Sequence, residues 1–276
     1  MQTPVMMVHG MCCTGEVWSH YREFFEARGV RVFTPTLRPD LRVNVRQRAV
    51  PALGELGLDD YVRDLQLECK RIEAETGRKP AVIGHSMGGL LAQALAASDS
   101  VVAAVFISPA APAGVRTLRM RGLWTGFKML RALGLTRWFV KPDLRTTAVM
   151  VLNCMPRRQR RAIWESMVLE SGKAFADFVH FPVDASKIHV PVLTVAATLD
   201  RLLPASLVRL TGRRYAAIGG EFREYAQHAH WLYAEPGWER PAADVFEWLE
   251  RVTARHDMPS ELPLRPDLRV GATTSA

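Results

Sequence analysis

The stretch from Ala81 to Ala97 reads AVIGHSMGGLLAQALAA, an apolar run followed by Gly-His-Ser-Met-Gly-Gly and then by residues rich in Leu and Ala. The first part predicts a buried strand, and the last part, which lacks a helix breaker, predicts a helix. A chain that turns sharply at Gly84 and enters a helix at once lifts the Ser86 hydroxyl clear of the sheet edge. Glycine is required at Gly84 and Gly88 because a side chain there would collide with the turning backbone. The pattern is typical of the G-x-S-x-G turn that presents a nucleophilic serine.

Length and composition limit the class of protein. The 276 residues, 48% of them hydrophobic, suffice for one α/β domain with an insertion or for two domains. No run approaches 18 apolar residues, and no basic segment precedes an apolar run at the N-terminus, so we expect neither a membrane span nor a secretory signal. The four cysteines fit no metal spacing and are interpreted as reduced thiols of a cytoplasmic protein: Cys12, Cys13, Cys69 and Cys154.

The formal charge of +8 is concentrated in one segment. Between Val115 and Arg161 there are twelve basic residues and one acidic residue, a balance of +11, so the rest of the chain carries −3. The excess of 30 Arg over 6 Lys is open to two interpretations, genomic base composition or function, and base composition alone does not explain the clustering.

Strand and helix patterns alternate on both sides of the Ser86 turn. Buried strands are predicted at residues 5–8, 30–34, 81–83, 101–108 and 190–195, with a further strand at 221–225. Helices are predicted at residues 16–28, 59–77, 204–211 and 242–253, and residues 37–56 are interpreted as an irregular surface loop. This order predicts a doubly wound, mostly parallel sheet with helices on both faces.

The alternation stops between residues 110 and 189. This segment is predicted to form helices in which apolar and aromatic residues are interleaved with arginines. We interpret it as a helical cap over the carboxyl ends of the strands, where open α/β sheets bind ligands. The expected domains are a core of residues 1–109 and 190–254, the cap of residues 110–189, and a mobile tail of residues 255–276.

Two later strands end beside residues that could activate Ser86. Asp200 follows the strand at 190–195, where it could orient an imidazole. The loop after the strand at 221–225 contains His228 and His230. We favour His230 as the general base because Trp231-Leu232 would form a wall behind its ring, and His228 is the alternative. His85, inside the turn, is expected to be structural.

Acyl transfer also requires two N–H donors aimed at the developing oxyanion. Met87, directly after the nucleophile, would supply one. The other would come from the loop after the first strand, which begins His9-Gly10, with Met11 as first choice and Cys12 next.

Ser86, Asp200 and His230 occur in the order nucleophile, acid, histidine, and His9-Gly10 precedes them. In this order of site residues the chain resembles the α/β-hydrolase fold family over residues 3–253. The start VHGMCCTGEVW is most similar to the branch of plant methylesterases and hydroxynitrile lyases, and also to many bacterial esterases. The resemblance implies a serine esterase with a Ser-His-Asp catalytic triad, an acyl-enzyme, an oxyanion hole, and no metal or organic cofactor.

The expected substrate is a small hydrophobic carboxylic ester, which includes lactones, thioesters and lysophospholipid-like acyl esters, and it could carry an anionic group that pairs with an arginine. The candidate substrate-binding residues are Cys12, Trp124, Phe127, Trp138 and Trp231. A cap that merely exposes its arginines to water is the simplest alternative, and contact of residues 118–140 with an anionic membrane surface is another. No nucleic acid is expected to bind. The oligomeric state stays open.

Two other classes of function remain. One is a lyase or a cofactor-free oxidative enzyme on the same fold. Hydroxynitrile lyases have a lysine soon after the catalytic histidine, whereas Lys187 is the last lysine here, which disfavours a lyase. The other is a binding protein without catalysis, which the presence of every expected group disfavours.

One heptapeptide, LRPDLRV, occurs at residues 37–43 and again at residues 264–270. The spacing is not that of a repeat protein. Chance or recombination in the tail is preferred over a regulatory tail that imitates the first copy.

Overall fold

The computed structural model describes residues 1–42, 50–115, 139–178 and 180–257. Six strands form one sheet in the order β2-β1-β3-β4-β7-β8, and all five neighbouring pairs are parallel. The strands are β1 (Val5–Val8), β2 (Val32–Phe33), β3 (Ala81–His85), β4 (Ala104–Ile107), β7 (Val192–Ala197) and β8 (Glu221–Tyr225). The predicted doubly wound parallel sheet is confirmed.

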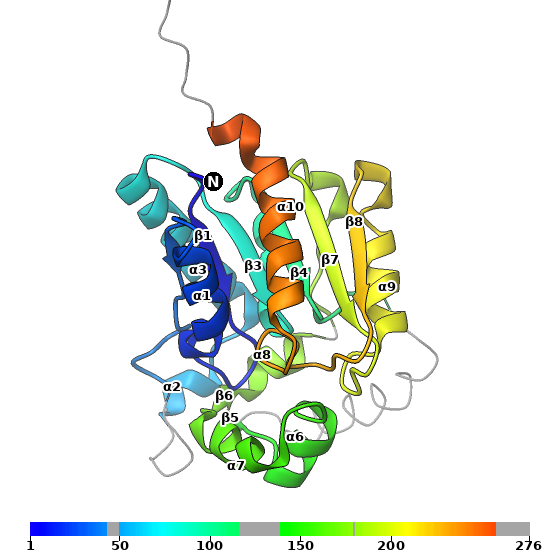
Figure 1. The fold of residues 1–276 in the computed structure, drawn as a ribbon. Helices are drawn as coiled ribbons and strands as arrows, with labels where there is room; N and C mark the ends of the chain where they lie inside the picture. The colour runs from blue at the N-terminus through cyan, green and yellow to red at the C-terminus, as the bar shows by residue number, and fades with distance from the viewer. Residues whose placement is uncertain (43–49, 116–138, 179, 258–276) are drawn as a thin grey trace, which may run out of the picture.

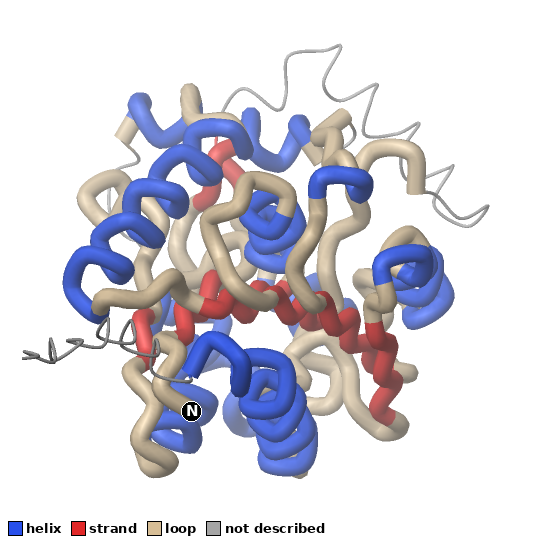
Figure 2. The backbone as a smooth tube through the Cα atoms, turned by 90° about the horizontal axis from the view of Figure 1, so that it is seen from above, coloured by secondary structure: helices blue, strands red, loops and turns tan. Residues whose placement is uncertain are grey.

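Helices cover both faces of this sheet, as Figures 1 and 2 show. One hydrophobic cluster joins the sheet to α3 (Leu58–Thr76), α4 (Met87–Ala96) and α9 (Ala205–Arg213). A second cluster joins the opposite face to η1 (Gly15–Trp18), α1 (Ser19–Glu26) and α10 (Glu239–Asp257). Three short helical turns lie between these elements: α2 (Pro51–Gly54), η2 (Ala185–Lys187) and η3 (Ala216–Ile218). In its described part, the predicted irregular loop at residues 37–56 therefore contains the helical turn α2.

The turn between β3 and α4 depends on two glycines. A Cβ at Gly84 would lie 2.1 Å from the carbonyl oxygen of Gly88, and a Cβ at Gly88 would lie 2.2 Å from that of Val8. Both distances are far below van der Waals contact, so only glycine fits. The close approach brings the N-terminus of α4 against the end of β1.

Residues 110–189, which we call the insertion, connect β4 to β7 in the sequence, and their described part lies outside the six-stranded sheet. Their described part contains α6 (Leu144–Met150), α7 (Arg157–Ser166), α8 (Gly172–Asp177) and an antiparallel pair of strands, β5 (Phe139–Val140) and β6 (Glu170–Ser171). Figure 1 shows α6 and α7 beyond the carboxyl ends of the sheet strands. The prediction of helices alone is wrong at β5 and β6, because a strand of two residues has no detectable periodicity.

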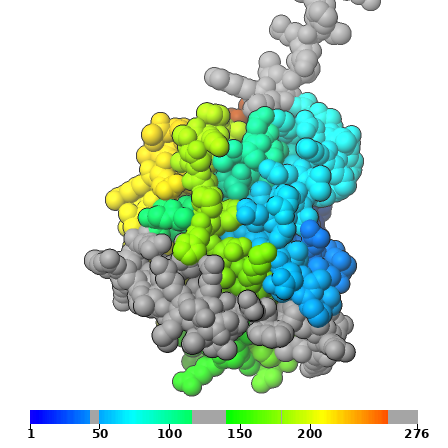
Figure 3. Space-filling view, turned by 180° about the vertical axis from the view of Figure 1, so that it is seen from behind, coloured from blue at the N-terminus to red at the C-terminus, as the bar shows by residue number. Residues whose placement is uncertain are grey.

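The insertion also reaches back along the core. In Figure 3 its last part runs between the cyan segment that includes α3 and the yellow α9. The Leu58 N–H donates to Asp177 Oδ2 at 3.0 Å, and Arg214 donates to the carbonyl oxygen of Val183 at 2.8 Å. The insertion is therefore attached to helices at opposite ends of the sheet.

The arginines of α7 lie at the surface, since none of its residues is buried. Arg160 donates to the backbone oxygens of Met155 at 2.8 Å and Asn153 at 2.9 Å, and Arg161 lies 3.7 Å from Glu165. The expected amphipathic stretch at residues 118–140 and the second LRPDLRV copy fall almost wholly outside the described residues. No helix of the described ranges is both long and apolar enough to cross a membrane.

We predict that Gly88→Ala destabilises the protein by about 3 kcal/mol or more, because its Cβ would force the backbone of β1 away from α4. Urea denaturation would measure the loss. Gly212→Ala in α9 is the matched control, since its Cβ would contact side chains at 3.1 Å or more. Equal stability of the two variants would contradict the steric argument.

Candidate active site

Ser86 lies at the junction of β3 and α4 with φ 55° and ψ −116°, a conformation that non-glycine residues rarely adopt. Two backbone bonds hold it there: the Ser86 N–H donates to the oxygen of Ile107 at 3.0 Å, and the Ser86 carbonyl accepts from Ala110 at 2.9 Å. The next residue, Met87, is the first of α4, where backbone N–H groups have no partner within the helix. The turn thus places a hydroxyl beside an N–H donor that has no partner within its helix.

Asp200 and His230 form a buried pair. The ring Nδ1 of His230 lies 2.8 Å from Asp200 Oδ2, and the other carboxylate oxygen accepts the N–H groups of Leu202 at 2.9 Å and Leu203 at 2.8 Å. The carboxylate can only accept, so Nδ1 carries the proton and Nε2 of a neutral His230 remains free to take one. The structure therefore brings together two of the predicted residues in the predicted relation.

His85 connects the serine turn to the His230 loop. Its Nε2–H donates to the carbonyl oxygen of His230 at 2.8 Å, and the two rings lie 4.6 Å apart. Burial, reinforced by His230, holds the pKa of His85 well below its usual value, so this ring stays neutral. These contacts fit a structural function.

The Ser86 hydroxyl makes no hydrogen bond to the other described residues. The contact between a nucleophile and its base often tightens only when substrate binds.

A carboxylate that the sequence analysis missed holds the histidine loop. Glu235 is buried and accepts the N–H groups of Ala229 at 2.7 Å and Trp231 at 3.1 Å, on either side of His230. His228, the alternative base, lies 3.6 Å from Glu235 through its Nδ1 and lines a separate surface hollow with Arg223 and Arg240. The geometry favours His230.

The loop after β1 passes close to the nucleophile. A Cβ at Gly10 would lie 3.1 Å from the Cβ of Ser86. The His9 Nδ1–H donates to the Gly10 oxygen at 2.8 Å, and His9 Nε2 accepts the N–H of Leu37 at 3.1 Å. Burial, and then the charge of Arg42, lower the pKa of His9 to about 3, so it is neutral at physiological pH.

Cys12, one of the two oxyanion-donor candidates of this loop, has a positive φ of 61°. Its N–H donates to Glu170 Oε2 at 3.4 Å, and its thiol donates to the oxygen of Val140 at 3.3 Å. Burial and the charge of Glu170 raise the pKa of the Cys12 thiol well above its usual value. The thiol is neutral and packed, and the N–H already has an acceptor.

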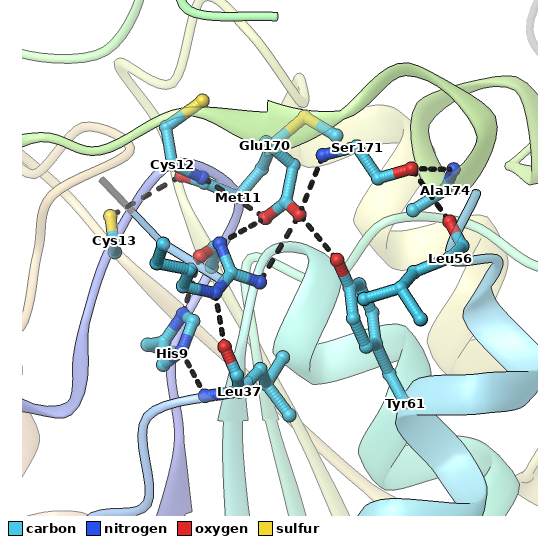
Figure 4. A network of polar contacts seen from close by, with 12 residues as sticks. His9, Met11, Cys12, Cys13, Leu37, Leu56, Tyr61, Glu170, Ser171 and Ala174 are labelled. Carbon is cyan, nitrogen blue, oxygen red and sulfur yellow. Dashed lines mark hydrogen bonds and ion pairs between the residues drawn. The ribbon is translucent and has the colours of Figure 1, made fainter. Parts of the chain in front are cut away.

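Glu170 is the centre of a buried polar network, drawn in Figure 4. Arg42 donates to its two oxygens from Nη1 at 2.8 Å and Nη2 at 3.1 Å, Tyr61 donates its hydroxyl at 2.7 Å, and Ser171 donates its N–H at 2.9 Å. Burial opposes ionisation of Glu170, but these donors outweigh it and keep the pKa of its carboxyl below the usual value. The sequence analysis missed this network, although Arg42 belongs to the repeated heptapeptide.

A cavity of about 840 Å³ lies between the insertion and the core, and we call it the Trp231 cavity. Its apolar lining includes Met155, Ile163, Met167, Trp231 and Trp238, and its polar lining includes Glu16, His20, Arg158, Gln159 and Glu239. Of the candidate substrate-binding residues, Trp231 lines it and Cys12 does not. Ser86 is also absent from its described lining. Trp124, Phe127 and Trp138 lie outside the described residues.

Within the described ranges, no group of three or more His, Cys, Asp or Glu side chains is arranged to hold a metal ion.

The comparisons with known proteins agree with this architecture. A family model described as "Alpha/beta hydrolase family" matches residues 5–248, so the chain belongs to the α/β-hydrolase family. No curated protein matches it in sequence.

Many solved structures share the fold. A monoacylglycerol lipase from Paleococcus ferrophilus is 23% identical with a TM-score of 0.65, and the match covers 90% of this chain and 95% of that one. An esterase from Thermogutta terrifontis is 20% identical with a TM-score of 0.63, and the match covers 91% of this chain and 90% of that one. A methylesterase from Arabidopsis is 14% identical with a TM-score of 0.63, and the match covers 92% of this chain and 99% of that one. These likenesses establish the fold.

We predict that the free energy of unfolding falls as the pH is lowered from about 6.5 to 5. The folded pKa of His9 and of His85 lies below the unfolded value near 6.5, so the unfolded chain takes up protons that the folded chain does not. The contribution of these two groups to the free energy of unfolding is complete above pH 6.5. Below that pH it falls by about 1.4 kcal/mol per pH unit for each histidine. Urea denaturation at several pH values would measure the slope.

His9→Gln should remove about half of that slope, whereas the exposed His189→Gln should leave it unchanged. A wild-type protein equally stable at pH 5 and 6.5 would contradict the assignment of neutral, buried imidazoles.

Proposed function

We propose that the protein is a serine hydrolase that cleaves a hydrophobic carboxylic ester through an acyl-enzyme on Ser86. The observation that carries the proposal is the 2.8 Å hydrogen bond between His230 and Asp200. The backbone oxygen of His230 also accepts a hydrogen bond from His85, the residue before the strained Ser86. A strained serine between strand and helix and an imidazole with one fixed tautomer are what nucleophilic acyl transfer requires.

In the proposed reaction His230 Nε2 takes the proton of Ser86 as Oγ attacks the carbonyl carbon. The carbonyl electrons move to the oxygen, and they return as the bond to the alkoxide breaks and His230 gives that alkoxide its proton. A water molecule, deprotonated by the same imidazole, then attacks the acyl-enzyme and releases the acid and Ser86. Asp200 stabilises the imidazolium in both steps.

The oxyanion hole in this proposal consists of the N–H groups of Met87 and Met11. Met87 begins α4, where the helix dipole also favours negative charge. Met11 is preferred over Cys12 because the Cys12 N–H is directed to Glu170.

The proposed hydrophobic substrate is supported by the Trp231 cavity. Its volume suits a small molecule, its lining includes the apolar side chains of Met155, Ile163 and Trp238, and Trp231 directly follows His230. Arg158 in the lining could pair with an anionic group on the substrate. Several similar structures are named as lipases or esterases, which also favours ester substrates.

We predict that Ser86→Ala abolishes the hydrolysis of p-nitrophenyl esters without loss of folding, and that His230→Ala lowers kcat by about 10³-fold or more, since removal of a triad member leaves only residual catalysis. Steady-state kinetics together with circular dichroism would measure both effects.

His228→Ala is the matched control for His230→Ala and should keep kcat within a few-fold of the wild type. Labelling of Ser86 by a fluorophosphonate would separate a serine hydrolase from a binding protein. Identification of acid and alcohol among the products would separate it from a lyase or an oxidative enzyme. Undiminished turnover by Ser86→Ala would refute the acyl-enzyme.

We predict that Ile163→Trp, which fills the Trp231 cavity, lowers kcat/KM for long-chain p-nitrophenyl esters by about tenfold or more and leaves p-nitrophenyl acetate nearly unchanged. A series of esters from acetate to palmitate would show the change. Val149→Trp on α6 is the control, because Val149 is exposed and outside the cavity. An identical chain-length profile for both variants would place the acyl chain elsewhere.

A further inference from the structure

Met11, the proposed second oxyanion donor, lies between two peptide groups that are each held by a buried side chain. On one side the Gly10 oxygen accepts from His9 Nδ1–H at 2.8 Å. On the other side the Cys12 N–H donates to Glu170 at 3.4 Å. The C=O and N–H of a trans peptide point in opposite directions, so the bond to the Gly10 oxygen turns the Met11 N–H away from His9. The peptide groups on both sides of the Met11 Cα are therefore held by hydrogen bonds.

These two side chains belong to one closed ring of hydrogen bonds, which Figure 4 shows from close by. The Leu37 N–H donates to His9 Nε2 at 3.1 Å, and the Leu37 oxygen accepts from Arg42 Nε. Arg42 in turn holds both oxygens of Glu170. The ring therefore runs from Leu37 through His9 to the turn at Gly10–Cys12, and back through Glu170 and Arg42.

The insertion holds Cys12 at three points. Its N–H donates to Glu170, its carbonyl oxygen accepts the N–H of Val168 at 2.9 Å, and its thiol donates to the oxygen of Val140. A non-glycine residue with φ 61° costs conformational energy and persists only where its surroundings determine it. The strained residue after Met11 is thus determined by β5, β6 and the chain before β6.

A function in stability alone does not account for the buried Arg42–Glu170 ion pair. The side chains of Arg42 and Glu170 are almost completely inaccessible to solvent, and a buried ion pair is weak evidence for stability because desolvation offsets its attraction. Each side-chain nitrogen of Arg42 and each carboxylate oxygen of Glu170 nevertheless has at least one hydrogen-bond partner, and a buried cluster connected in this way is rigid. Rigidity next to an oxyanion hole has a function, since the donors must be aligned before charge develops.

We propose that Glu170 and Arg42 are positioning residues for the oxyanion hole. They hold the turn at Gly10–Cys12 so that the Met11 N–H is aimed at the carbonyl oxygen before the substrate binds. The proposal rests on the proposed ester hydrolysis at Ser86.

The test is the double variant Arg42→Met/Glu170→Met, which removes both charges at similar volume and leaves neither partner buried alone. We expect kcat to fall about 10- to 100-fold with KM within about threefold, because one oxyanion donor contributes about 10²–10³-fold and would here be misaligned rather than deleted. The affinity for an alkyl trifluoromethyl ketone, whose adduct with Ser86 carries an oxyanion, should fall by the same factor. The affinity for the product carboxylate should not change.

Arg71→Met/Glu75→Met is the matched control, because it removes an ion pair of 2.7 Å that lies exposed on the surface. It should leave kcat and ketone affinity unchanged. Tyr61→Phe keeps both charges and removes one hydrogen bond to Glu170, and it decides the matter if the double variant does not fold. In that case a loss of about threefold or more in both kcat and ketone affinity supports the proposal, and a smaller loss overturns it.

A folded double variant with kcat and ketone affinity within twofold of the wild type would overturn the positioning function. The proposed ester hydrolysis is checked separately by fluorophosphonate labelling of the wild-type protein at Ser86. Absence of labelling and of turnover in the wild type overturns both proposals. Normal labelling and turnover in both the wild type and the Arg42→Met/Glu170→Met variant overturns only the positioning function.

Discussion

The close approach of α4 to the end of β1 is the constraint on which the rest of the structure depends. Gly84 and Gly88 permit it, since a Cβ at either would lie within about 2.2 Å of a backbone oxygen. The approach forces Ser86 into its strained conformation and sets Gly10 beside it. A hydroxyl, a helix N-terminus and the loop after β1 are thereby fixed at one point of the sheet edge. The same glycines serve packing and chemistry at once.

Three loops reach this edge, and each is held by a buried carboxylate that accepts backbone N–H groups. Asp200 binds the N–H groups of the two residues that follow Arg201, Glu235 binds those that flank His230, and Glu170 binds those of Cys12 and Ser171. Loops lack the regular hydrogen bonds of helices and strands, so their buried N–H groups need other acceptors. A carboxylate supplies several acceptor sites in one group, and each one here also fixes a residue of the candidate site.

The sequence predicts those parts of the fold and site that are encoded locally. The Ser86 turn, the bounds of β8, and the positions of Asp200 and His230 after their strands follow from short patterns, because parallel strands bring their carboxyl ends together. Arg42 and Glu170 could not be paired in this way, since 128 residues separate them and neither belongs to a periodic pattern. Glu235, by contrast, lies five residues after His230, and an acidic residue in an otherwise apolar loop was a usable signal.

The insertion has two kinds of contact with the site, and they are not independent. Residues of α7 and its flanks line the Trp231 cavity, while β5, β6 and the chain before β6 hold Cys12. Both contacts are made by one segment whose parts pack together, as the antiparallel pairing of β5 with β6 and the hydrogen bond from Lys141 to the oxygen of Met167 indicate. A substitution that displaces Met167 or the chain before β6 therefore reshapes the cavity and also strains the turn beside Ser86. In the proposed enzyme such a substitution changes substrate preference and kcat together, because the wall proposed to select the substrate is continuous with the proposed support of the oxyanion hole.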